Sequence, residues 1–124
     1  MLLPHTLPLT SISRLHYPNT AMQRDALFAD VALPGTGPGT SRTLRLCTTH
    51  LESLRVTPPR RPAQLAAAAA HLRQAYAGVL GGDLNAIEEF DKGLHGECGL
   101  KDAYLEGGGV EGEESGMTWY VCLS

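Results

Sequence analysis

Two polar segments of the chain carry side chains that can act on a phosphate group. His50 follows two threonines, and an imidazole can donate a hydrogen bond to a phosphoryl oxygen or move a proton near neutral pH. Asp83 and Asn85 follow a glycine pair; the carboxylate can orient or deprotonate a water, and the amide can donate to a developing oxyanion. His50, Asp83 and Asn85 are therefore the candidate catalytic residues. The alternative is structural, with a hydrogen-bonded histidine at a sheet edge and an Asx-turn that closes a strand.

A strand–helix–strand unit would bring these side chains together. Residues 43–51 alternate as a strand does, and residues 62–76 predict a helix that leads to a short buried strand ending near Asp83. A crossover helix makes the two strands parallel, so both carboxyl ends lie at one rim of the sheet. Ligand sites of open α/β sheets collect at that rim.

The helix is the clearest element that the sequence predicts. Pro62 suits a first helical position, and five consecutive alanines are strong helix formers. Gly78 is the expected stop. The apolar stripe expected to face the sheet is Leu65, Ala69, Leu72 and Tyr76.

Further strands are expected on either side of this unit. Residues 11–17 and 26–33 predict strands, and residues 34–42 are rich in glycine and proline, which favours a hairpin with a long tip. A last short strand is expected over residues 117–123. The fold class is therefore α/β (α+β).

Composition is that of one modest globular domain, since 43% of the 124 residues are hydrophobic and 19% are charged. Residues 1–82 hold eight Arg against three acids, whereas the remainder holds two Lys against ten acids. The basic part could meet a nucleic-acid backbone or be a set of solvated surface side chains. Three cysteines at wide spacing predict free thiols. With neither a signal peptide nor an apolar membrane span visible, we expect an intracellular protein, nuclear or cytoplasmic.

Taken together, the segments resemble the endonuclease/exonuclease/phosphatase (deoxyribonuclease I-like) superfamily, and in particular the tyrosyl-DNA phosphodiesterase 2-like proteins. The resemblance runs from about Ser13 to Trp119. It rests on five segments in addition to the alanine-rich helix: Pro18–Arg24, Thr49–Ser53, Gly82–Asn85, Lys101–Tyr104 and Thr118–Trp119.

The resemblance implies a role for each matching residue. His50 and Ser53 would contact the scissile phosphate, Asp83 would position or activate the attacking water, and Asn85 would bind a non-bridging oxygen. Arg24 and Trp119 would lie near the bound strand or support the site. The family uses Mg²⁺ to neutralise charge on the phosphoryl group. The implied fold is part of a four-layer α/β/β/α sandwich with mixed sheets.

The chain departs from the family pattern at both ends. We expect residues 1–124 to be one partial domain that lacks the N-terminal strands with the metal-binding Glu and the C-terminal Asp-His motif. No residue of this chain is assigned as a metal ligand. Such a chain is expected to be inactive, or nearly so, by itself.

Three functions remain open from the sequence. The first is a metal-dependent phosphodiesterase that acts on DNA 5′ ends or tyrosyl-DNA adducts, as in DNA repair. The second is a catalytically inactive remnant or interaction fragment, and the third is a phosphatase of small phosphorylated molecules such as phosphoinositides. A shared fold does not by itself choose the substrate.

Overall fold

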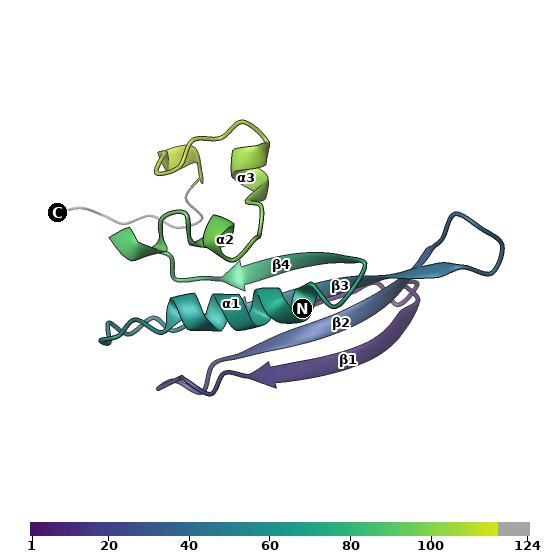
Figure 1. Ribbon diagram of the computed structural model, residues 1–124, viewed down its shortest axis with the longest axis horizontal. Helices are drawn as coiled ribbons and strands as arrows, with labels where there is room; N and C mark the ends of the chain where they lie inside the picture. The colour runs from purple at the N-terminus through teal and green to yellow at the C-terminus, as the bar shows by residue number, and fades with distance from the viewer. Residues whose placement is uncertain (117–124) are drawn as a thin grey trace.

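The structure, a computed structural model, describes residues 1–116. A mixed four-stranded sheet with strand order β1-β2-β3-β4 forms the centre of the fold, and helix α1 runs along one face of it (Figure 1). Neighbours β1, β2 and β3 pair antiparallel, whereas β3 and β4 pair parallel. The bounds of these elements are β1 Leu9–His16, β2 Asp25–Pro34, β3 Ser41–His50, α1 Arg61–Leu72 and β4 Ala77–Asp83.

The β2–β3 hairpin and the β3–α1–β4 crossover confirm the topology predicted from the sequence. The hairpin pairs without interruption from Ala26 opposite Thr49 to Pro34 opposite Ser41, so its strands extend further into the glycine-rich tip than expected. The parallel pairing runs to the last residues of both strands. The α/β class predicted from the sequence is correct.

The hydrophobic core lies between α1 and one face of the sheet. Phe28 of β2 is almost fully buried, and its ring contacts that of His71 on α1, with 4.3 Å between ring centroids. The predicted helix face is correct for Leu65, Ala69 and Leu72, which are all buried. Burying a leucine side chain contributes about 1.5–3 kcal/mol, so this face holds the helix to the sheet.

The C-terminal end of α1 differs from the prediction. The helix ends at Leu72 rather than Tyr76, because Ala77 already pairs with Leu44 as the first residue of β4. Tyr76 therefore lies in the connecting turn and is 64% exposed. Gly78 lies inside β4 instead of ending the helix, and a Cβ there would come within 3.0 Å of the Leu72 side chain.

After β4 the described chain forms only short helices. A side-chain cap is present on α3, where the Asp102 carboxylate accepts hydrogen bonds from the N–H groups of Tyr104 and Leu105. None of the described helices is long and apolar enough to cross a membrane. The strand expected over residues 117–123 lies outside the described residues. The short elements are η1 Glu89–Asp91, α2 Leu94–Glu97, α3 Ala103–Glu106 and η2 Glu114–Gly116.

Two of the three cysteines lie in the described part, and both Cys47 and Cys98 are free and buried. Burial raises the pKa of the Cys47 thiol to about 12. A thiol with so high a pKa forms little thiolate at neutral pH, so Cys47 acts as a small apolar side chain of the core.

A bidentate ion pair between Arg45 of β3 and Asp30 of β2 joins these two strands, and Arg45 also contacts the end of α1. Arg45 donates Nε to one carboxylate oxygen of Asp30 at 2.7 Å and Nη2 to the other at 2.9 Å. Its third nitrogen donates to the main-chain oxygen of His71 at 2.8 Å, in the last turn of the helix. Hydrogen bonds from Arg45 hold the pKa of Asp30 below its usual range, although burial opposes them.

This pair predicts a contribution to acid stability. The pKa of Asp30 is lower in the folded state than in the unfolded state, where it is about 4. The ionised carboxylate therefore adds its full contribution to the free energy of unfolding above the unfolded-state pKa, and this contribution disappears as pH falls through the folded-state pKa. Asp30→Asn should lower the melting temperature by a constant amount between pH 7 and 5. The difference from the unsubstituted chain should vanish in acid. A difference that persists unchanged to pH 2 would contradict this linkage.

Candidate active site

The parallel strands β3 and β4 place His50 and Asp83 side by side at the carboxyl rim of the sheet. These two terminal residues are direct partners in the β3–β4 register. Nε2 of His50 lies 3.4 Å from Oδ2 of Asp83, and both side chains are about half exposed. The juxtaposition predicted from the sequence is therefore present, and solvent and ligands can reach it.

Backbone geometry unusual for L-residues shapes the loop after β4. Gly82 has φ +146°, and a Cβ at this position would lie 1.9 Å from the main-chain oxygen of Thr49. Asn85 adopts a left-handed conformation with φ +48°, which Asn tolerates better than most residues. The glycine thus allows β4 to approach β3 closely, and the loop then turns sharply at the asparagine.

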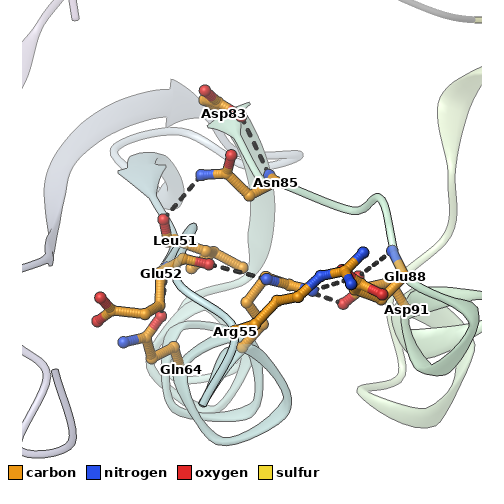
Figure 2. Close-up of polar contacts among 9 residues, drawn as sticks. Leu51, Glu52, Arg55, Gln64, Asp83, Asn85, Glu88 and Asp91 are labelled. Carbon is orange, nitrogen blue, oxygen red and sulfur yellow. Dashed lines mark hydrogen bonds and ion pairs between the residues drawn. The ribbon is translucent and has the colours of Figure 1, made fainter. Parts of the chain in front are cut away.

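Hydrogen bonds fix the side chain of Asn85 against the end of β3 (Figure 2). Its main-chain N–H donates to Oδ1 of Asp83 at 3.0 Å, and its Nδ2 donates to the carbonyl oxygen of Leu51 at 2.9 Å. Leu51 in turn donates its N–H to the main-chain oxygen of Asp83 at 2.9 Å. One amide hydrogen of Asn85 is therefore used, and among residues 1–116 the second has no acceptor and can meet a ligand.

The segment just after His50 is anchored by buried polar side chains from the start of α1. The main-chain N–H of Glu52 donates to Oε1 of Gln64 at 2.9 Å, and its carbonyl oxygen accepts Nη1 of Arg61 at 3.0 Å. Arg61 also forms a two-pronged ion pair with Asp91 of η1, with N–O distances of 2.9 and 2.7 Å. These contacts hold the end of β3, and so the site, to α1 and to the segment after β4.

Sequence reasoning missed this anchor, although the sequence contains a signal for it. The buried face of α1 continues toward its N-terminus through Gln64 and Arg61, which share the helical spacing of Leu65 and Ala68. Polar side chains on an apolar stripe need buried partners. In the sequence Asp91 stands in an acidic stretch with Glu88 and Glu89, which is typical of a solvated loop, and only the fold shows that its carboxylate lies 2.9 and 2.7 Å from the guanidinium of Arg61.

The other predicted site residues lie in or near the same rim where the structure describes them. Nη1 of Arg24 is 2.9 Å from Nδ1 of His50, and Oγ of Ser53 is 3.2 Å from the sulfur of Met22. Trp119 lies outside the described residues. An open cleft of about 340 Å³ borders His50, and its lining includes two arginines, Arg14 and Arg24, against one acid, Asp25, which lies 3.4 Å from Nε of Arg14. Such a lining suits an anionic ligand.

The described side chains do not complete a magnesium site. Both carboxylate oxygens of Asp83 are near partners of their own, the N–H of Asn85 and the ring of His50. Within residues 1–116, no group of three or more His, Cys, Asp or Glu side chains lies close enough to hold a metal ion. Octahedral Mg²⁺ prefers oxygen ligands, so the carboxylate of Asp83 does not by itself make such a site.

Comparison with solved structures identifies proteins whose fold is similar to that of this chain. A crystal structure of D. rerio TDP2 complexed with a single-strand DNA product matches with a TM-score of 0.56 and 25% sequence identity, over 78% of this chain and 36% of that chain. The chain resembles TDP2 in fold and in sequence. Truncated TDP2 from Caenorhabditis elegans matches with a TM-score of 0.53 and 25% identity, over 70% of this chain and 35% of that one. A humanized D. rerio TDP2 gives a TM-score of 0.56 and 26% identity, over 78% of this chain and 39% of that one.

The similarity to TDP2 confirms the resemblance predicted from the sequence, and the mixed sheet with its covering helix agrees with part of the family's sandwich. This chain spans between a third and two fifths of the length of the D. rerio TDP2 chains that it matches. No family model matches the chain, and no curated protein matches it.

Proposed function

We propose that the protein is a phosphodiesterase that acts on DNA 5′ ends or tyrosyl-DNA adducts, and that this chain contributes His50, Asp83 and Asn85 to its site. The observation that carries the proposal is the register pairing of His50 with Asp83 at the carboxyl rim, with Nε2 and Oδ2 3.4 Å apart. The similarity to a TDP2 bound to single-strand DNA supports DNA as the substrate.

Each side chain has a role that its position supports. The half-exposed carboxylate of Asp83 can orient a water for attack on phosphorus. An N–H of His50 and the free amide hydrogen of Asn85 can donate to the phosphoryl oxygens, where charge grows in the transition state. Arg14 and Arg24 in the adjoining cleft can attract the DNA backbone. The family resemblance adds a Mg²⁺ requirement to the proposal.

Hydrolysis of a 5′-phosphotyrosyl oligonucleotide by the purified 124-residue chain, with and without Mg²⁺, tests the proposal. Turnover should fall about 100-fold or more in Asp83→Asn, because a positioned general base contributes 10²–10⁴-fold. The matched control is Glu106→Gln, which removes an exposed carboxylate on α3 and should leave turnover unchanged. Measurable turnover that is equal in Asp83→Asn and in the unsubstituted chain would refute the assignment. If the chain by itself hydrolyses nothing, the binding measurement below decides instead.

Binding separates an inactive chain from a wrong substrate. The chain should bind a 5′-phosphorylated single-stranded oligonucleotide, and His50→Gln should weaken binding more than His5→Gln does. Binding without hydrolysis would favour the alternative of a non-catalytic remnant. Stronger competition by a phosphoinositide headgroup than by DNA would favour a phosphatase of small molecules. A folded chain that binds neither ligand would overturn phosphate recognition at this rim.

A further inference from the structure

The contact between Arg24 and His50 determines which ring nitrogen of the histidine carries the proton. Nη1 of Arg24 lies 2.9 Å from Nδ1 of His50, within hydrogen-bond distance. A guanidinium group stays protonated in proteins and has no acceptor, so Arg24 must donate. Nδ1 must then accept, and in the neutral ring the proton resides on Nε2. That nitrogen faces the rim, toward Asp83.

A single buried carboxylate holds the segment that presents Arg24. Glu52 has no solvent exposure, and its Oε2 accepts hydrogen bonds from Oγ1 of Thr20 at 2.8 Å and from the N–H of Ala21 at 3.0 Å. Burial alone would raise the pKa of Glu52, but the hydrogen bonds from Thr20 and Ala21 and the nearby charge of Arg60 outweigh it and lower the pKa. The carboxylate therefore stays ionised and can keep accepting at neutral pH.

The Thr20 hydroxyl transmits this anchoring to Arg24. While it donates to Glu52, it accepts the main-chain N–H of Met22 at 3.2 Å and that of Arg24 at 2.9 Å. One donor and two acceptor positions are the full capacity of a hydroxyl group. Two successive hydrogen bonds, through the Thr20 hydroxyl, thus connect the backbone of Arg24 to the carboxylate of Glu52. Glu52 lies two residues after His50 in the chain.

We propose that Arg24 is a positioning residue that fixes His50 as a neutral imidazole with its proton on Nε2, and that Thr20 and Glu52 hold Arg24 in place for this purpose. Under the proposed function, on which this consequence rests, His50 serves the phosphate as a hydrogen-bond donor through Nε2 and does not act as a base through Nδ1. Arg24 then acts through His50 rather than only as a contact to the bound strand, which is the role that the family resemblance implies.

Nitrogen NMR of the histidine side chains in the unliganded chain tests the proposal directly. In the neutral ring, His50 should show Nδ1 as the unprotonated, hydrogen-bonded nitrogen and Nε2 as the protonated one. His50→Gln assigns the signals, and the four other histidines are internal references. Arg24→Met should shift the Nδ1 resonance toward that of a nitrogen without a donor and allow the tautomers to mix.

Thr20→Val and Thr20→Ser form the matched pair for the anchoring step. Valine keeps the shape but removes the hydroxyl, so the His50 Nδ1 signal should change as in Arg24→Met. Serine keeps the hydroxyl and should preserve the signal of the unsubstituted chain. A proton on Nδ1 in that chain, or an Nδ1 signal that Arg24→Met leaves unchanged, would overturn the proposal. An unchanged signal in Thr20→Val would overturn the role of Thr20.

The NMR measurement does not depend on activity, so the two proposals can fail separately. If NMR shows the expected tautomer of His50 but the chain neither binds nor hydrolyses DNA, the positioning of His50 stands and the proposed function is refuted. If the chain binds DNA but His50 carries its proton on Nδ1, the proposed function stands and the positioning of His50 by Arg24 is refuted.

Discussion

Gly82→Ala should unfold the chain or destabilise it by roughly 4 kcal/mol or more, an effect reserved for a few severe mechanisms. The new Cβ would lie 1.9 Å from the main-chain oxygen of Thr49 and 3.0 Å from two further backbone atoms of that residue. No rotamer change relieves a clash with backbone, and φ +146° is itself unfavourable for alanine. Relief requires β4 to move away from β3.

Gly81→Ala provides the matched control, since it makes the same chemical change one residue earlier in the same strand. A Cβ at Gly81 meets nothing within 4 Å, and its φ does not lie in the region that favours glycine. This variant should keep the midpoint of urea unfolding close to that of the unsubstituted chain. Equal midpoints for the two alanine variants would show that the close approach of β4 to Thr49 is not required.

The clash at Gly82 also bears on the site, because the same approach pairs His50 with Asp83. If some Gly82→Ala chain remains folded, the terminal pairing of β3 and β4 should be lost first. Amide hydrogen exchange should then be faster at Leu51, whose N–H donates to the main-chain oxygen of Asp83. The sheet interior around Phe28 should stay protected.

Regular local patterns made much of this fold predictable. Alternation in residues 43–51, the alanine-rich helix and the glycine pair before Asp83 predict the β3–α1–β4 unit. The parallel direction of its two strands brings His50 and Asp83 to one rim. The predicted end of α1 at Tyr76 is wrong because strand pairing overrides helix propensity here. Ala77 pairs with Leu44 of β3, so the chain must leave the helix and turn before Ala77.

The polar contacts around the site were far less predictable, because they join residues distant in the chain. Arg61 meets Asp91 across 30 positions, and Thr20 meets Glu52 across 32. No periodicity in the sequence relates two residues so far apart, and a single charged residue is predicted to lie on the surface unless its partner is known. The proximity of Arg24 to the site came from a family resemblance, but its contact with Nδ1 of His50 required coordinates.

Asp91→Leu should destabilise the chain by about 3–5 kcal/mol, because it leaves Arg61 charged and buried without its partner. Both side chains of this pair are only 3% exposed, so water cannot solvate the guanidinium in place of the carboxylate. Asp91 also accepts the N–H of Glu88 at 2.9 Å, and that donor would lose its acceptor. Urea unfolding followed by circular dichroism measures the loss.

The double variant Arg61→Met/Asp91→Leu identifies the cause of that loss. If the unpaired charge dominates, removing Arg61 as well should restore much of the stability, since a buried ion pair and an apolar pair of similar volume are often equivalent. Recovery should stay incomplete, because the carbonyl oxygen of Glu52 then lacks the hydrogen bond from Arg61. Lys101→Ala, which breaks an exposed ion pair with Glu106, should leave the unfolding midpoint unchanged. A double variant no more stable than Asp91→Leu would show that Arg61 acts through Glu52, at the base of the His50 rim, more than through its charge.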